Sequence, residues 1–393
     1  MTKKWRMFSS LVLVLMMVAG LAGCGGDKKP DAKPADSKEI KIGGNFEMTG
    51  GIANFGKQTV NGIKLAFKEA NAAGGVNGKQ VVFVVADNKS EPSESTNAIT
   101  KLITQDKVVA VMGPVSSSNV LATLQVAQDN KVPVVTATAT NPKVTEENGK
   151  VKPYAFRACF IDPFQGTVMA NFAAKSLQAK TAAIFIDNSS DYSKGLAQFF
   201  EEGFVKNGGK VISKEGFLQK DQDFKATLTK IKAQNPDVIF IPAYYEEVGK
   251  IVKQARELGI TAPLLGTDGW DDPKLAEIAG TAPLNNGFFS NHYSSQDKDP
   301  NIIKFVEAYK KEYGEEPSAL AALGYDSGLM MIDALKRANS LDPTKIRDAL
   351  EQTKNLQVST GILTLNEKHD PVKSAVVIEM KEGKQVFKEK INP

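Results

Sequence analysis

Cysteine and histidine, which supply metal ligands, nucleophiles and catalytic bases, are scarce in this sequence. The 393 residues contain two cysteines, Cys24 and Cys159, and two histidines, His292 and His369. The histidines lie far apart in the sequence, so neither a zinc-ligand spacing nor a Ser-His pair is suggested. The nucleophile-elbow, P-loop and H-E-x-x-H motifs are absent as well. The sequence therefore predicts a protein that is not an enzyme, with no cofactor and no metal site.

A surplus of basic residues is also lacking. Lys and Arg total 49 against 45 Asp and Glu, which gives a formal net charge of +4. Three of the basic residues, Lys3, Lys4 and Arg6, lie in residues 1–23, which contain no acidic residue, so the remainder carries a net charge of +1. A nearly neutral protein lacks the positive field that attracts a phosphate backbone. We expect no nucleic-acid partner.

Long hydrophobic runs are missing except near the N-terminus. There the apolar run from Leu11 to Val18 follows the basic residues and is too short for an ordinary membrane span. Residues 1–23 are predicted to be a secretory signal peptide. The segment "LAGC", ending at Cys24, resembles the lipobox of bacterial lipoproteins, which implies cleavage before Cys24 and attachment of lipid to it. The alternative is an unmodified cysteine in a simple secretion signal.

The residues after Cys24 predict a tether. Residues 24–38 are rich in Gly, Pro, Lys and Asp and almost free of large apolar residues, a composition typical of a flexible segment. With Cys24 lipidated, Cys159 has no disulfide partner in the chain. Cys159 lies in the apolar run "YAFRACFID", so we expect a buried, inert thiol.

Short apolar runs alternate with helical periods along the rest of the chain. The first series contains "IKIGGNF", "VVFVVAD", "VVAVMGP" and "VPVVTAT", and the second contains "TAAIFID", "KVISKEGF", "DVIFIPA" and "APLLGTDG". Alternation of nearly all-apolar strands with helices predicts parallel sheets covered on both faces. Because 393 residues exceed what one core usually serves, we expect an α/β protein of two lobes with a cleft between them. Two late helices and a terminal hairpin follow, and periodicity does not assign them to a lobe.

Polar residues follow several of these strands. After "VMGP", Ser116, Ser117 and Ser118 precede a helix, and hydroxyls with free N–H groups at a helix N-terminus suit a carboxylate. The alternative is that Ser117 or Ser118 simply caps the helix. The segment "TATATNP" offers carbonyls and the hydroxyls of Thr138 and Thr140, or else forms a turn set by Asn141 and Pro142.

The segment "IPAYYEEVGKIV" places aromatic and acidic residues where a buried strand meets a helix. Glu246 and Glu247 either face a ligand at the carboxyl end of the strand or stabilise the first turn of the helix through its dipole. Together, the serines would provide a site for an anion on one lobe, and this segment would provide a carboxylate for a cation on the other. A zwitterionic ligand, which carries both charges, needs both sites.

Seven segments, in order, resemble the type I periplasmic solute-binding proteins of ABC transporters, in particular the branch that binds leucine, isoleucine and valine. They are "GGNFEMTGGIANFGKQTVNGIKLAFKEANAAGGVNGK", "GPVSSSNV", "TATATNPKVT", "FRACFIDPFQG", "IDNSSDYSKGLAQFF", "PAYYEEVGKIVKQARELG" and "GTDGWDDPKL". The resemblance implies two doubly wound parallel-sheet lobes joined by a three-segment hinge. We expect lobe I over residues 39–157 plus 292–363, and lobe II over residues 158–291 plus 364–393.

The resemblance also implies where a ligand is held. Ser117 and backbone amides are expected to hold an α-carboxylate. The α-ammonium is expected to be held by Glu247 and by the segment of Thr138, Ala139 and Thr140, while Glu246 faces solvent.

Further residues are implied for the rest of the pocket. Phe55 and Tyr192 are expected to wall a side-chain pocket, but they do not single out one amino acid. Asp268 is expected to assist with the ammonium or with a polar ligand side chain, with a surface turn as the alternative. Some relatives have a disulfide beside the loop that contains the three serines, where this chain has Ser116. The missing disulfide predicts that this loop is more mobile here.

The expected function is that of an extracytoplasmic, lipid-anchored receptor. It would bind an amino acid, branched-chain or similar, by hinge closure and deliver it to an ABC permease in the membrane. We expect a monomer that reaches the membrane through its lipid anchor only. The alternatives are a ligand-sensing module for a receptor, a binder of an amide or aromatic acid, and a lipoprotein enzyme acting on amino-acid derivatives.

Overall fold

The computed structural model describes residues 38–392. The predicted signal peptide, the predicted lipidation site Cys24 and residues 24–37 of the predicted tether lie outside the described residues. Within residues 38–392, no helix combines the length and the apolar character that a membrane span requires.

The first sheet contains five parallel strands in the order β2-β1-β3-β4-β7. They are β1 (Glu39–Phe46), β2 (Gln80–Asp87), β3 (Ala110–Met112), β4 (Val134–Thr136) and β7 (Ala155–Arg157). The chain runs outward from β1 to β2 and then returns across β1 to β3. Right-handed crossovers therefore place α1 on one face of the sheet and α2 and α3 on the other. These helices are α1 (Ala53–Ala72), α2 (Pro92–Thr104) and α3 (Ser117–Asn130).

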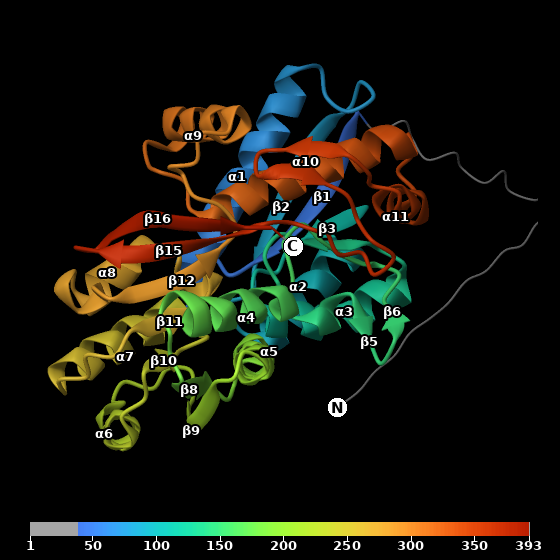
Figure 1. The fold of residues 1–393 in the computed structure, drawn as a ribbon. Helices are drawn as coiled ribbons and strands as arrows, with labels where there is room; N and C mark the ends of the chain where they lie inside the picture. The colour runs from blue at the N-terminus through green and yellow to red at the C-terminus, as the bar shows by residue number, and fades with distance from the viewer. Residues whose placement is uncertain (1–37, 393) are drawn as a thin grey trace, which may run out of the picture. The chain divides into compact units, whose positions relative to one another are not determined.

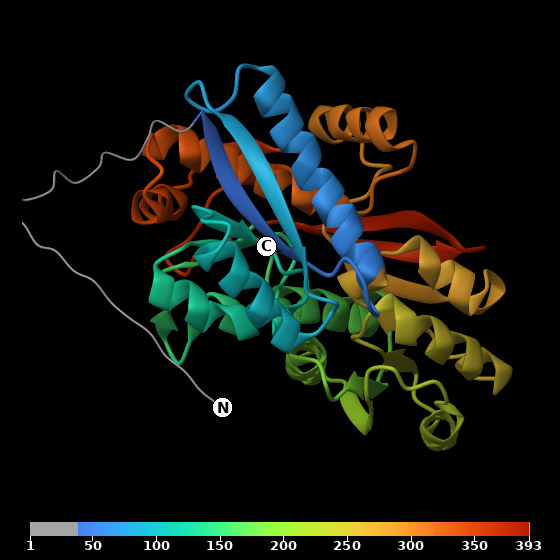
Figure 2. The same ribbon diagram turned by 180° about the vertical axis from the view of Figure 1, so that it is seen from behind.

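A helix from late in the sequence completes this first lobe. Helix α10 (Ala319–Ala338) packs directly on α1, and the two backbones approach closely at glycines. A Cβ atom on Gly62 would lie 2.0 Å from the carbonyl oxygen of Ala321, and one on Gly324 would lie 2.3 Å from that of Thr59. Figure 2 shows α1 beside β1 and β2, with the helices of residues 300–351 behind them. We call the structure built around this sheet the first lobe.

The second sheet contains seven strands in the order β16-β15-β12-β11-β10-β8-β9, which follow one another down the left side of Figure 1. They are β8 (Thr181–Asp187), β9 (Lys210–Phe217), β10 (Val238–Phe240), β11 (Leu264–Gly266), β12 (Gly287–Asn291), β15 (Ala375–Lys381) and β16 (Lys384–Ile391). Strands β9, β8, β10, β11 and β12 are parallel to their neighbours in the sheet. Strand β15 pairs in antiparallel fashion with both β12 and β16. The helices of this second lobe are α4 (Asp162–Asn171), α5 (Asp191–Lys206), α6 (Lys225–Gln234), α7 (Tyr245–Glu257) and α8 (Pro273–Ala279).

The remaining elements are short or peripheral. They are β5 (Glu146–Glu147), β6 (Lys150–Val151), β13 (Leu356–Val358), β14 (Gly361–Leu363), α9 (Pro300–Tyr313), α11 (Pro343–Glu351), a π-helical turn (Phe172–Ser176) and the 3-10 turns Pro142–Val144, Asp268–Trp270 and Ala282–Leu284.

The predicted α/β architecture with parallel sheets is confirmed. The terminal hairpin is confirmed as β15–β16, and it extends the second sheet because β15 pairs with β12 in antiparallel fashion. The predictions did not include β7, β12 or the short strands β5, β6, β13 and β14. β7 lies in the apolar run around Cys159, to which we assigned no strand.

Candidate functional site

A small cavity lies between the two lobes. Its walls come from segments that follow strands of both parallel sheets, which is where ligands bind in open α/β sheets. The first lobe contributes Phe55, Val115, Ser117, Thr138 and Leu320, and the second contributes Tyr192, Tyr244, Asp268 and Gly269. Five of the residues predicted from the sequence are thus brought together: Phe55, Ser117, Thr138, Tyr192 and Asp268.

The serine loop, residues 113–119, leads from β3 into α3. The cap of α3 is Ser116 rather than Ser117 or Ser118, because the Ser116 hydroxyl accepts a hydrogen bond from the Asn119 N–H at 3.4 Å. Ser117 is 1% exposed and lines the cavity, and its hydroxyl accepts a hydrogen bond from the Asn141 N–H. Within residues 38–392, the N–H groups of Ser117 and Ser118 meet no hydrogen-bond acceptor. This helix N-terminus can therefore hold an anion.

The second polar loop, Thr138–Asn141, follows β4. The Thr138 hydroxyl donates to the Val115 carbonyl at 3.0 Å and so links the two loops. The Ala139 carbonyl accepts hydrogen bonds from the Arg157 guanidinium at 2.7 Å and from the Cys159 thiol at 3.4 Å.

Ala139 and Thr140 are buried beside the cavity but are not among its lining residues. The free thiol of Cys159 is fully buried, as predicted, and burial raises its pKa to about 12. The inert thiol thus lies under the second polar loop.

Three aromatic rings form the apolar part of the cavity. The rings of Tyr192 and Tyr244 stack with centroids 5.0 Å apart and planes 8° apart, and Phe55 meets Tyr244 edge-on at 5.9 Å. Burial raises the pKa of both tyrosines well above the ordinary value, so both phenols stay neutral. Tyr244 lies in the quoted segment "IPAYYEEVGKIV", but we predicted no role for it. Its position soon after a buried strand could have identified it as a pocket residue.

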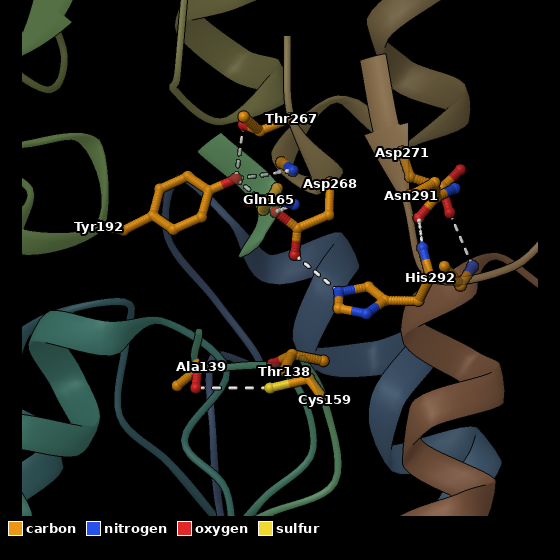
Figure 3. Close-up of polar contacts among 12 residues, drawn as sticks. Thr138, Ala139, Cys159, Gln165, Tyr192, Thr267, Asp268, Asp271, Asn291 and His292 are labelled. Atoms are coloured by element: carbon orange, nitrogen blue, oxygen red, sulfur yellow. Dashed lines mark hydrogen bonds and ion pairs between the residues drawn. The ribbon is translucent and has the colours of Figure 1, made fainter. Parts of the chain in front are cut away.

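Asp268 supplies the carboxylate of the cavity. Its oxygens accept hydrogen bonds from the Tyr192 hydroxyl at 2.5 Å, from Gln165 Nε2 at 2.8 Å and from His292 Nε2 at 3.0 Å. Figure 3 shows Tyr192 and His292 approaching Asp268 from different sides, with Thr138 and Ala139 lower in the view. No other acidic residue is among the cavity-lining residues. The cavity can therefore neutralise a cation at Asp268.

Glu247 lies in a separate, larger groove beside the cavity. This groove, of about 1250 Å³, is lined by Glu247, Lys220, Ser118 and other polar residues, and Tyr244 is the residue that lines both the groove and the cavity. Glu247 Oε1 accepts a hydrogen bond from the Lys220 N–H at 2.9 Å, and burial raises the pKa of Glu247. Glu246 is half-buried and forms an ion pair with Lys250 on the same helix.

The two lobes also contact each other directly around the cavity. On one side, Asn54 Nδ2 donates to both Asp272 oxygens at 2.8 and 2.7 Å. On the other side, the Ser118 hydroxyl donates to Asp191 Oδ2 and accepts from the Asp191 N–H, both at 3.0 Å. These contacts correspond to a closed arrangement of the lobes.

The histidines do not form a metal site. His292 contacts Asp268, whereas His369 lies elsewhere, stacked on Phe156 at 4.3 Å. In the part of the chain that the structure describes, no cluster of three or more His, Cys, Asp or Glu side chains could hold a metal ion.

The chain matches the family model described as periplasmic binding protein over residues 39–385. A curated relative from Pseudomonas aeruginosa, the "Amino acid binding protein", is 31% identical over 316 residues, which cover 80% of this chain and 82% of the relative.

Two solved structures are similar throughout the described residues. The leucine-binding protein LivK from Thermotoga maritima is 42% identical with a TM-score of 0.85, and the match covers 90% of this chain and 99% of LivK. The branched-chain amino acid transporter substrate-binding protein LivJ from Streptococcus pneumoniae, solved with isoleucine, is 37% identical with a TM-score of 0.84, covering 90% of this chain and all of LivJ.

Proposed function

Because the chain belongs to the periplasmic binding protein family, we propose that it is an extracytoplasmic receptor that binds an amino acid, branched-chain or similar, for an ABC importer. The similarity to a leucine-binding protein and to an isoleucine-bound transporter protein supports this ligand class.

The observation that carries the proposal is the separation of charge across one cavity. The free N–H groups and the Ser117 hydroxyl at the start of α3 suit an α-carboxylate. The carboxylate of Asp268, on the other lobe, suits an α-ammonium. A zwitterion satisfies both, and an amide or an aromatic acid satisfies only one of them.

We propose Asp268, rather than Glu247, as the principal partner of the ammonium. Asp268 lines the cavity, whereas Glu247 lines the adjacent groove and accepts the Lys220 N–H at its Oε1. The Thr138 hydroxyl lies beside the serine loop, where we place the carboxylate of the ligand. Ala139 and Thr140 would support that loop from behind, because Arg157 and Cys159 already occupy the Ala139 carbonyl.

The ligand side chain would then lie among the apolar walls. Phe55, Leu320 and the stacked rings of Tyr192 and Tyr244 would surround it. These walls come from both lobes, so a complete pocket exists only when the lobes are closed. The ligand therefore stabilises the closed state through contacts that an open state lacks.

The hinge and the membrane anchor complete the proposal. The chain would pass between the lobes near residues 157, 291 and 363. Lipid attached to Cys24 would keep a monomeric receptor beside its permease, and more than one acyl chain would be needed for a stable anchor. The protein would deliver its ligand unchanged, without catalysis. Release of a Cys24→Ser variant from membranes would support the anchor, and continued membrane retention would exclude it.

The test is calorimetric titration of the processed protein, freed of carried-over ligand by unfolding and refolding. The ligands are the twenty L-amino acids, a few amides and a few aromatic acids. Tight binding of a small related set of amino acids, lost in Asp268→Asn, would support transport of those amino acids. A response only to amides or aromatic acids would overturn the proposal. Turnover of amides would point to an enzyme, and a signalling partner without a permease would point to a sensor.

A further inference from the structure

A buried glutamate that sequence reasoning did not select lies beneath the serine loop. Glu47 directly follows β1, and its side chain is fully buried. Its carboxylate is a costly group at such a position, because no Lys, Arg or His contacts it in the described part of the chain. Such a group needs a full set of hydrogen bonds.

The serine loop supplies those hydrogen bonds. The Val115 N–H donates to Glu47 Oε2 at 3.0 Å, and the Ser116 N–H donates to Oε1 at 3.2 Å. The Asn119 side chain donates to Oε1 at 2.7 Å. The carboxylate thus contacts both ends of the segment that contains Ser117 and Ser118.

The position of Glu47 itself is fixed by the surrounding backbone. A Cβ atom on Gly56 would lie 2.1 Å from the Glu47 carbonyl oxygen, so helix α1 packs directly on this residue. The next two residues, Met48 and Thr49, donate their N–H groups to Asp87 at 3.0 and 3.1 Å. The carboxylate is therefore presented to the loop from a rigid base.

The hydrogen bonds divide the loop N–H groups into two sets. Those of Val115 and Ser116 are used by Glu47, and that of Asn119 is used by the Ser116 hydroxyl. Those of Ser117 and Ser118 remain for a ligand. Because Glu47 holds Ser116 on one side and Asn119 on the other, the backbone of Ser117 and Ser118 between them is restrained as well.

We infer that Glu47 is a positioning residue for the ligand carboxylate: its buried side chain holds the serine loop so that the free N–H groups of Ser117, which lines the cavity, and Ser118, which lines the adjacent groove, are presented to that carboxylate. The inference rests on the proposed function, because it assigns the carboxylate end of an amino acid to this loop. Glu47 acts through the loop and does not touch the ligand.

The test compares Glu47→Gln with Asp237→Asn. Gln keeps the shape of the side chain but turns one acceptor into a donor that faces an N–H group. Asp237 is the matched control, because its carboxylate also accepts two backbone N–H groups, those of Lys180 and Thr181, but lies in the second lobe and does not contact the serine loop. L-leucine is the probe, and each change is combined with Ser117→Ala in a double-mutant cycle.

We expect Glu47→Gln to weaken L-leucine binding about 10-fold, because a buried donor loses its acceptor. The loss should be much smaller when Ser117 is already Ala, since both changes act on the same carboxylate site. Asp237→Asn should change binding less than about 2-fold and be additive with Ser117→Ala. Unchanged binding in Glu47→Gln, or additivity with Ser117→Ala, would overturn the inference.

A ligand-free measurement separates failure of this inference from failure of the proposed function. Hydrogen exchange of the peptide over residues 113–119 should be about 10-fold faster in Glu47→Gln and unchanged in Asp237→Asn. If the unmodified protein binds no amino acid, the proposed function fails and this role for Glu47 fails with it, whatever the loop does. If L-leucine binds but exchange in the loop is unchanged, only the inference fails. Should Glu47→Gln not fold, Asn119→Leu removes one donor to Glu47, and its effect on L-leucine binding must also be smaller when Ser117 is Ala.

Discussion

The cavity and the groove beside it each contain a buried carboxylate, and the two carboxylates differ in their surroundings. Asp268 is 7% exposed and Glu247 is 6% exposed, so burial does not distinguish them. Asp268 lines the cavity and accepts hydrogen bonds from three side chains, whereas Glu247 lines the groove and accepts one hydrogen bond from the Lys220 N–H. A place in the cavity wall and a fixed set of donors, rather than burial alone, identify the carboxylate suited to a ligand cation.

The largest effect should come from Asp268→Asn. Removal of this charge leaves a desolvated ammonium without its counter-ion, so we expect amino-acid affinity to fall about 100-fold or more. Calorimetric titration with L-leucine measures the loss, and the melting temperature of the free protein serves as the folding control. Retained affinity in a folded Asp268→Asn variant would remove the cavity from consideration as the ammonium site.

The second effect concerns the interlobe contact at Asp272. Burial raises the pKa of this carboxyl to about 6 in the closed arrangement, against an ordinary value of 3.8. In an open molecule the hydrated carboxyl would return toward the ordinary value, so closure takes up a proton between about pH 4 and 6. Acidification therefore favours closure, and we expect amino-acid affinity to rise by up to about 10-fold from pH 7 to pH 5.

The pH dependence can be assigned to Asp272 by substitution. In Asp272→Asn most of the rise should disappear, and any remaining slope would come from Asp162, Glu47, Asp187 and Glu247, whose pKa values burial also raises. The pKa of His292 is lowered by burial, so its protonation would oppose binding only at still lower pH. Titrations at pH 5, 6 and 7 measure the slope. The same slope in both proteins would show that closure does not depend on Asp272.

A smaller effect should come from Tyr192→Phe. This change keeps the ring that stacks on Tyr244 but removes the hydroxyl that donates to Asp268. We expect a loss of about 5-fold in amino-acid affinity, because one hydrogen bond to a charged group is lost while the apolar wall remains. The comparison is with Tyr244→Phe, whose hydroxyl makes no hydrogen bond within residues 38–392 and should matter less. Equal losses would show that the hydroxyl of Tyr192 does not orient Asp268.

Much of the fold was predictable because it depends on local patterns. Nearly all-apolar strands alternating with helices indicated parallel sheets, and the residues after those strands pointed to Ser117, Thr138 and Asp268. The strands β7 and β12 were missed, since neither follows a helical period that the sequence displays clearly. The assignment of the terminal hairpin to the second sheet depends on a pairing with β12 that no local pattern contains.

The missing parts of the site depend on contacts between distant segments. Leu320 reaches the cavity because α10 packs on α1, and nothing near Leu320 in the sequence indicates this position. Glu47 was overlooked because its partners lie about 70 residues later in the chain. The resemblance implied a more mobile serine loop, because some relatives have a disulfide where this chain has Ser116, whereas the structure shows three hydrogen bonds from that loop to Glu47. Sequence periodicity finds the elements, but it does not show which buried groups the packing brings together.

The smallest effect should come from Glu247→Gln, and this variant most directly tests the comparison between the two carboxylates. Gln can still accept the Lys220 N–H through its carbonyl oxygen, and Glu247 does not line the cavity. We expect amino-acid affinity to change less than about 3-fold, since no charge near the ligand is lost. Glu246→Gln is the matched control, because it removes a negative charge from the same first turn of α7 and so measures any effect that acts only through the helix dipole. A loss as large as that of Asp268→Asn would place the ammonium in the groove, and Glu247 would then hold the role that the sequence resemblance implies.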